Sequence, residues 1–209
     1  MWFLLMVMWG WMGVGPQTPE DTALQLETRL RALKSLQADF QQTYHSINVS
    51  TPLQEKGRLH ILKPGWMRFD YFDPEVKVFL IKDDLYQEYW PEDKQLVERT
   101  LAEEGSEGAL LSLLSGTRGI LDNYSVEFDL DADGKISAAR LKITPRNEDE
   151  ADTFIILELD DRTGLIRKAV SFDWTGNRQE FEFSGIKADI PLPESLFELE
   201  VPPDVDIIR

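Results

Sequence analysis

Cysteine is absent from this sequence of 209 residues, and histidine occurs twice, at His45 and His60. Without cysteine the chain cannot form disulfides, thiolate zinc sites or iron–sulfur ligation, and no cysteine can serve as a nucleophile or carry a lipid of the chain's own. The two histidines show neither a His-x-His nor a Glu-x-x-His spacing, so neither a zinc site nor a histidine-based catalytic triad is predicted.

Basic residues are also scarce. The chain has 22 Lys and Arg against 38 Asp and Glu, which gives a net charge of −16. A protein that binds nucleic acid must neutralise phosphates with a basic surface, so this class of function is excluded, and the same repulsion argues against docking on anionic lipid. The 42% of hydrophobic and 11% of aromatic residues predict a folded core rather than disorder, and the length suits one large domain.

A run of thirteen uncharged residues, WFLLMVMWGWMGV, begins at Trp2. It is too short to span about 30 Å of hydrocarbon, which needs about 20 residues, but it resembles the apolar core of a secretory signal. No Lys or Arg precedes it and no A-x-A cleavage site follows it, so a truncated signal or a buried segment is the alternative. We expect residues 1–16 to be a signal-like apolar segment that directs export, and residues 17–209 to form a single domain.

Residues 19–45 show a helical pattern. Apolar residues recur at steps of three and four from Leu26 to Tyr44, which would place them on one stripe of a helix. Thr18 is suited to cap this helix, with Pro19 in its first turn. The pattern predicts one long helix of roughly seven turns.

From Arg58 onward the apolar period changes to two, which is typical of strands. About ten strands are predicted between residues 58 and 183, and a short helix at residues 108–114 interrupts them. Turns of two to four residues join most of these strands, so neighbours in sequence should pair as an antiparallel meander. The sequence therefore predicts one α+β domain.

These strands have one aromatic face and one charged face. We expect the aromatic face to carry Met67 with Phe69 and Tyr71, Val170 with Phe172 and Trp174, and Phe181 with Phe183. A sheet of this size must curl over such a face, and the long amphipathic helix is the obvious element to cover it. Two interpretations stay open: the rings fill a packed core, or they line a gap that accepts an apolar ligand.

Three further motifs carry no chemistry. DLDADG at residues 129–134 begins like a calcium-binding loop, but its twelfth position is Arg140 instead of a bidentate Glu, so a hairpin turn is predicted. The acidic run at residues 147–152 is typical of a solvated loop, and LSGTRG at residues 114–119 lacks the lysine of a phosphate-binding loop. A hydrolase that uses acids at the mouth of a barrel is kept as an alternative, but no motif requires an enzyme.

Several segments resemble, in order and spacing, the periplasmic outer-membrane lipoprotein carrier family, LolA. They are LQADFQQT (36–43), GRL (57–59), KPGWMRFDY (63–71), the turn at Pro74, LY (85–86), YWP (89–91), DWTGN (173–177), FSGI (183–186), LFEL (196–199) and VPPDVD (201–206). The resemblance covers residues 22–208. It implies an incomplete antiparallel β-barrel of about ten to eleven strands, closed by a long N-terminal helix and short lid helices around a hydrophobic cavity.

The resemblance also implies a function. Members of the family are carriers and not enzymes: they take acylated lipoproteins from an inner-membrane ABC transporter complex and pass them to an acceptor at the outer membrane. We therefore expect a periplasmic monomer that needs no cofactor. A lipid or glycolipid carrier, or an envelope sensor on the same half-barrel, is the alternative.

The resemblance assigns roles to individual residues. A family arginine holds the cavity shut through the closing helices, and the matching residue here is Lys63, which keeps the charge but loses the planar guanidinium fork. The net charge, independently of the resemblance, suggests that docking to partners would need a local basic patch, for which Arg29, Arg31 and Lys34 are candidates. The residues expected to contact acyl chains are Leu30, Leu33, Phe40, Met67, Phe69, Tyr71, Phe172, Trp174 and Phe181.

Overall fold

The structure is a computed structural model that describes residues 17–83, 85–100, 105–116, 119–131, 133–147 and 153–209. The signal-like segment at residues 1–16, most of the acidic run at 147–152 and part of the stretch at 114–119 lie outside these residues. Within the described part of the chain, no helix is long and apolar enough to cross a membrane.

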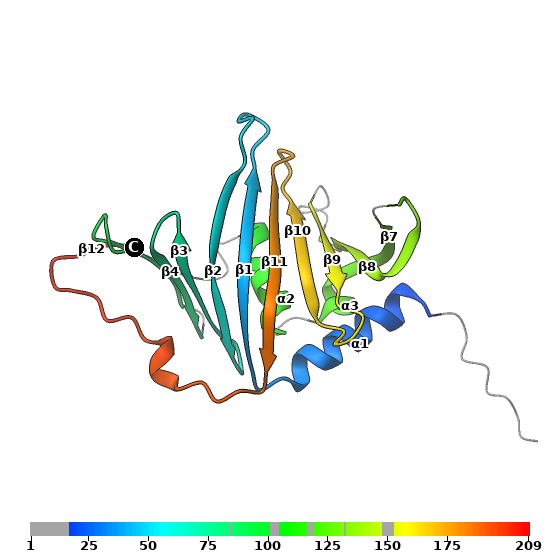
Figure 1. The fold of residues 1–209 in the computed structure, drawn as a ribbon, viewed down its shortest axis with the longest axis horizontal. Helices are drawn as coiled ribbons and strands as arrows, with labels where there is room; N and C mark the ends of the chain where they lie inside the picture. The colour runs from blue at the N-terminus through cyan, green and yellow to red at the C-terminus, as the bar shows by residue number, and fades with distance from the viewer. Residues whose placement is uncertain (1–16, 84, 101–104, 117–118, 132, 148–152) are drawn as a thin grey trace, which may run out of the picture.

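Twelve strands form one sheet in the described residues, in the order β12-β6-β5-β4-β3-β2-β1-β11-β10-β9-β8-β7 (Figure 1). Neighbours pair antiparallel, except that β12 runs parallel to β6. The sheet is not closed, as expected for an incomplete barrel. The strands are β1 (Ser35–His45), β2 (Leu53–Leu62), β3 (Trp66–Asp73), β4 (Lys77–Lys82), β5 (Leu85–Trp90), β6 (Gln95–Thr100), β7 (Tyr124–Leu130), β8 (Ile136–Pro145), β9 (Phe154–Leu159), β10 (Ile166–Phe172), β11 (Arg178–Ala188) and β12 (Asp206–Ile208).

Three α-helices accompany the sheet in the described residues: α1 (Pro19–Ala32), α2 (Gly105–Ser115) and α3 (Ile120–Asn123). Figure 1 shows α2 behind the middle of the sheet and α1 below its right-hand part, where α1 contacts β7 and β8. The short helix predicted at residues 108–114 is therefore confirmed as part of α2, whereas the single turn of α3 was not anticipated. DLDADG joins β7 to β8, which confirms the predicted hairpin turn.

The prediction of one helix over residues 19–45 is wrong. α1 begins as expected, with Thr18 and Asp21 exchanging hydrogen bonds of 3.1 and 3.2 Å in a capping box, but it ends at Ala32. The following residues form β1, which pairs with β2 on one side and with β11 on the other. Apolar residues spaced by four fall on one face of a helix and also on one face of a strand. Pairing of residues 35–45 with β2 and β11 stabilises the strand.

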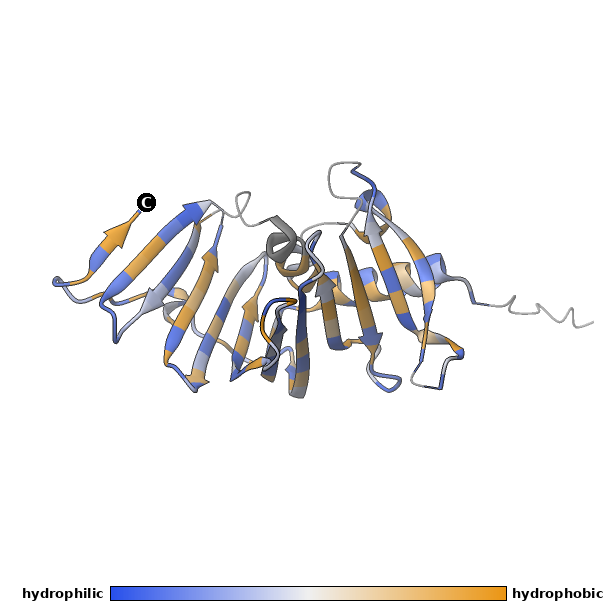
Figure 2. Ribbon diagram, turned by 90° about the horizontal axis from the view of Figure 1, so that it is seen from above, coloured by the Kyte–Doolittle hydropathy of each residue, from blue (hydrophilic) through white to orange (hydrophobic). Residues whose placement is uncertain are grey.

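Alternation along the strands separates a hydrophobic face from a hydrophilic one, as the colours in Figure 2 show. The hydrophobic face meets the helices, and its core includes Leu59, Met67 and Leu157 with Leu26 of α1 and Leu113 of α2. We call this the helix-side face and the opposite one the outer face. The 3-10 helix η3 (Glu194–Phe197) lies against β3 and β4.

Candidate ligand-binding cavity

A cavity of about 250 Å³ opens between the helix-side face of the sheet and α2. Its walls come from β1 to β5, from β11 and from α2, and they are mostly aromatic and aliphatic. The lining residues are Gln42, Tyr44, Leu53, Glu55, Phe69, Tyr71, Lys77, Phe79, Ile81, Tyr86, Glu88, Trp90, Leu110, Leu111, Gln179 and Phe181.

Aromatic rings from neighbouring strands form the wall beside this cavity. The ring of Phe40 lies edge-on to Tyr71, with 4.9 Å between ring centres, and to Phe69 at 5.6 Å, while Phe181 lies 5.8 Å from Phe40. Gly57 makes room for this cluster, because a Cβ atom there would lie 2.4 Å from Cζ of Phe40 and 2.5 Å from the carbonyl oxygen of Asp70. Alternation in the strands thus places the rings, and one glycine lets Phe40 lie against the backbone.

The residues expected to contact acyl chains fall into three groups. Phe69, Tyr71 and Phe181 line the cavity. Leu30, Phe40 and Met67 are buried in the core next to it, and Leu33 is partly buried against that core. The remaining two, Phe172 and Trp174, lie elsewhere.

The expectation for Phe172 and Trp174 is wrong. In the register of β10 with β11, Ala169 opposes Phe181, so Phe172 points to the outer face, where it stacks on Phe154 with 4.4 Å between ring centres. Trp174 follows the end of β10 in a turn and is 79% exposed. Alternation within one strand shows which of its residues share a face, but pairing decides which face that is.

Polar side chains inside the cavity were not anticipated from the sequence. Lys77 and Glu55 form an ion pair with Nζ and Oε1 2.6 Å apart, and each side chain is 8% exposed. The Tyr71 hydroxyl donates to Oε1 of Gln42 at 2.5 Å, and the Tyr86 hydroxyl donates to Oε1 of Glu88 at 2.8 Å. The sequence did offer one indication of this position. Lys77 precedes Phe79 by two residues, and residues two apart in a strand lie on the same face of the sheet.

The helix α2 covers the cavity and is held at its end by Lys63. Leu110 and Leu111 of α2 contribute to the lining. Lys63, in the turn between β2 and β3, donates from Nζ to the carbonyl oxygen of Ser115, the last residue of α2. Burial disfavours the charged ammonium and lowers the pKa of Lys63. The resemblance to the family thus pointed to the residue that contacts the helix over the cavity.

A second contact fixes the segment after α2. The backbone N–H of Ile120, at the start of α3, donates to Oε2 of Glu27 at 2.8 Å, and Oε1 of the same carboxylate lies 2.7 Å from Arg31. Glu27 is buried, and these two contacts satisfy both oxygens of its carboxylate, which would otherwise be costly to remove from water. α1 therefore anchors α3, although it does not itself line the cavity.

Comparison with known proteins identifies the family. Residues 31–200 match the family described as outer membrane lipoprotein carrier protein LolA. The chain belongs to this family. An outer-membrane lipoprotein carrier protein of Dechloromonas aromatica is 26% identical over 88% of this chain and 86% of its own length, and one of Methylococcus capsulatus is 24% identical over 99% and 95%.

Solved structures of other proteins show the same fold. An uncharacterised conserved protein from Thermus thermophilus superposes with a TM-score of 0.54 at 15% identity, over 90% of this chain and 99% of that one. A Vibrio parahaemolyticus domain named for outer membrane lipoprotein sorting superposes with a TM-score of 0.53 at 16% identity, over 86% and 95%. The LolA family is a carrier family, so the chain is a carrier of the lipoprotein or lipid type and not an enzyme, and its relatives indicate a location in the cell envelope.

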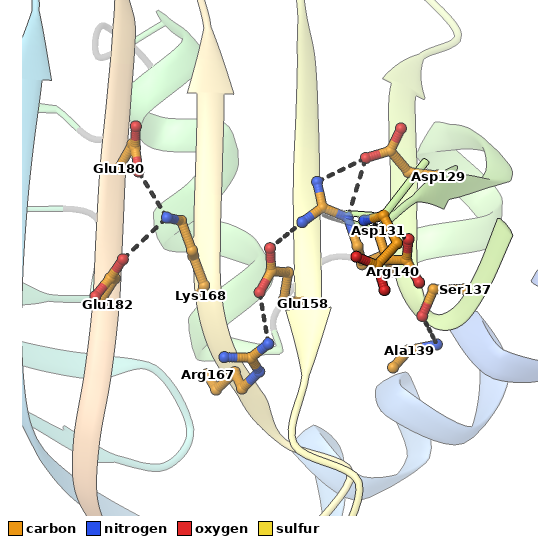
Figure 3. Close-up of polar contacts among 11 residues, drawn as sticks. Asp129, Asp131, Ser137, Ala139, Arg140, Glu158, Arg167, Lys168, Glu180 and Glu182 are labelled. Carbon is orange, nitrogen blue, oxygen red and sulfur yellow. Dashed lines mark hydrogen bonds and ion pairs between the residues drawn. The ribbon is translucent and has the colours of Figure 1, made fainter. Parts of the chain in front are cut away.

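The outer face of this LolA family member carries a network of ion pairs, shown in Figure 3. Arg140 bridges Asp129 and Glu158, and Glu158 also pairs with Arg167 at 2.8 Å. Beside them, Lys168 lies 2.7 Å from Glu180 and 2.9 Å from Glu182. Partial burial opposes the charged form of Lys168, but the two carboxylates outweigh it and raise the pKa of this ammonium.

The basic patch expected for docking is partly used within the chain. Arg31 pairs with Glu27, and Nη1 of Arg29 donates to the carbonyl oxygen of Thr163 at 2.5 Å. These contacts tie α1 to the turn between β9 and β10 and to α3. The role of Arg29, Arg31 and Lys34 in docking stays a prediction.

Proposed function

We propose that this protein binds the acyl chains of lipoproteins in its cavity and carries them through the periplasm, from an inner-membrane ABC transporter complex to an acceptor at the outer membrane. The observation that carries the proposal is an aromatic-lined cavity under α2 in a chain of the lipoprotein carrier family. Each methylene that leaves water contributes about 0.8 kcal/mol, so burial of long acyl chains, and not of a few carbons, can outweigh the cost of association.

Opening of α2 supplies the opposing cost. The cavity has to widen to admit acyl chains, and the Lys63 hydrogen bond to Ser115 resists movement of α2. This cost lowers the net affinity, so that a more hydrophobic acceptor can take the cargo. No cofactor or nucleotide enters this mechanism, because the transporter would supply the energy.

The proposal includes the remaining expectations from the sequence. Residues 1–16 act as the signal-like segment that directs export, and the carrier works as a monomer. Phe69, Tyr71 and Phe181 contact the cargo directly, while Leu30, Leu33, Phe40 and Met67 support them from the core. The acidic surface keeps the loaded carrier in solution and away from anionic bilayers.

The test is extraction of a triacylated lipoprotein from membranes. The purified protein is incubated with membranes that hold the lipoprotein and the transporter, and the soluble fraction is analysed by native mass spectrometry. A soluble one-to-one complex that passes its cargo to acceptor-containing vesicles is expected. A complex with free lipid or glycolipid instead of lipoprotein would support the alternative carrier, and a failure to extract any acylated molecule would overturn the proposal.

A further inference from the structure

A buried lysine lies inside a cage of aromatic rings at the cavity. Nζ of Lys77 is 4.6 Å from the ring centre of Tyr71, 4.7 Å from that of Trp90 and 5.4 Å from that of Phe79. The carboxylate of Glu55 completes the cage at 2.6 Å. Rings and a carboxylate around one ammonium are the arrangement by which proteins bind ligand cations.

The stability of the fold does not require the charges of Lys77 and Glu55 inside the cavity. Both side chains of the pair are 8% exposed, so both charges have lost most of their hydration. A buried ion pair commonly contributes no more stability than apolar side chains of the same volume. An aliphatic pair would also suit an acyl-chain cavity better, and the charges are therefore more simply explained by recognition of a ligand.

The cage lies between the mouth of the cavity and its apolar interior. At the mouth, Tyr44 and Leu53 are 38% and 52% exposed. Along β2, Glu55 follows Leu53 on the same face, and deeper in the cavity Phe69 and Ile81 are almost fully buried. A ligand whose chains fill the interior would place its polar head at Glu55 and Lys77.

The charge of the lining favours a cationic head. Among the cavity residues that the structure describes, the charged ones are Lys77, Glu55 and Glu88, which sum to −1. Glu88 lies on β5 directly opposite Phe79, one wall of the cage. A ligand ammonium would balance this charge, whereas a phosphate or carboxylate head would add to it.

We propose that Glu55 and the rings of Tyr71, Phe79 and Trp90 form a binding site for the ammonium group of an acylated ligand, and that Lys77 occupies this site as an internal competitor when the cavity is empty. The inference rests on the proposed function and adds a preference to it. Among acylated cargoes, those with a free amino group beside their acyl chains, such as diacylglyceryl cysteine with an unacylated α-amine, would use this site, whereas N-acylated cargo would leave it to Lys77. Competition by Lys77 weakens binding of such cargo and thereby promotes its release.

Two probes that differ only at the amino group test this inference. One is a diacylated lipopeptide with a free α-amine, and the other is the same lipopeptide N-acetylated. In Lys77→Met the amino group of the probe no longer competes with a lysine. We therefore expect the free-amine probe to bind this variant about tenfold more tightly than it binds the wild type, with little change for the acetylated probe. In Glu55→Gln the preference for the free amine should disappear.

A matched control is Lys82→Met. Lys82 lies at the other end of β4, and its Nζ is 4.2 Å from the ring centre of Trp66, outside the cavity. This variant should bind both probes as the wild type does. Because Lys77→Met leaves Glu55 buried without its partner, the double variant Glu55→Gln/Lys77→Met is measured too, and it should bind both probes with equal affinity.

The outcomes separate the two proposals. If Lys77→Met binds both probes with unchanged affinity, the ammonium site is wrong and the lipoprotein carrier proposal stands. If the wild type binds neither probe, the carrier proposal fails and the ammonium site fails with it. Tighter binding of the free amine in Lys77→Met, lost again in the double variant, supports the ammonium site.

Discussion

At the scale of single residues, two phenylalanines on opposite faces of the sheet test which side chains contact the ligand. Phe69 lines the cavity on the helix-side face, whereas Phe172 stacks on Phe154 on the outer face. Phe69→Ala should weaken binding of a fluorescent acyl probe about tenfold, because it removes ring contacts with the chains. Phe172→Ala should leave probe binding within about twofold, and an equal loss in both variants would contradict the assignment of the cavity.

At the residue scale, the proposed function makes Lys63 a latch that resists the opening of α2. Lys63→Leu removes the hydrogen bond from Nζ to the Ser115 carbonyl, so α2 should open more readily. A single hydrogen bond contributes about 1 kcal/mol, which predicts about fivefold tighter net uptake of the acyl probe and slower release. Lys63→Arg keeps a donor and is the control. Unchanged uptake and release in Lys63→Leu would show that this residue is not a latch.

Asp70 gives the outer face a pH-dependent contact. Burial favours its protonated form, but His60 at 3.5 Å and Arg68 at 2.8 Å outweigh burial and lower the pKa of Asp70. Arg68 in turn donates to the carbonyl oxygen of Leu196 at 2.9 Å, which fastens the C-terminal segment to β3.

The sign of the pH dependence follows from this lowered pKa. A carboxylate whose pKa is lower in the folded state stabilises the fold above its ordinary pKa, and this contribution is lost as the pH falls through the lowered value. Asp70→Asn should therefore cost about 1–2 kcal/mol of unfolding free energy at pH 7 and progressively less below about pH 4. Urea unfolding across pH measures it. Asp39→Asn, which breaks an ion pair with half-exposed side chains, should cost under about 0.5 kcal/mol.

At the scale of elements, α1 and the segment after α2 depend on one carboxylate. Glu27→Gln removes the charge that receives the Ile120 N–H and pairs with Arg31. The loss of a charged, buried hydrogen bond predicts about 1–3 kcal/mol lower stability in chemical denaturation, together with faster amide exchange at Ile120. Glu20→Gln on the exposed side of the same helix is the control. Equal effects of the two changes would contradict an anchoring role for Glu27.

At the scale of the whole molecule, an open sheet has edges that must be protected. β12 covers β6 through parallel pairing, and this end is also tied by Arg209 to Glu98 at 2.7 Å and by Lys94 to Asp204 at 2.6 Å. Removal of residues 204–209 would expose the edge of β6 to other chains. We expect self-association that sedimentation velocity detects, whereas removal of Arg209 alone should leave a monomer. A monomeric long truncation would contradict the protective role of β12.

Local signals in the sequence determined much of this fold. The capping box at Thr18, the period-two strands, the turns between them and the short helix over the cavity follow from hydrogen-bonding groups and spacings within a few residues of each other. The order and spacing of several segments also indicated the LolA family, and the resemblance to that family implied the contact made by Lys63. The composition alone, through the net charge of −16, indicated an acidic surface.

Only the tertiary structure decided three further points. Residues 35–45 fit a helix or a strand, and pairing with β2 and β11 chose the strand. The register of β10 with β11 sent Phe172 to the outer face, because alternation fixes relative and not absolute facing. The approach of β2 and β4 within the sheet brought Glu55 to Lys77, two charges that are unremarkable in the sequence and form a buried pair only because distant strands place them together.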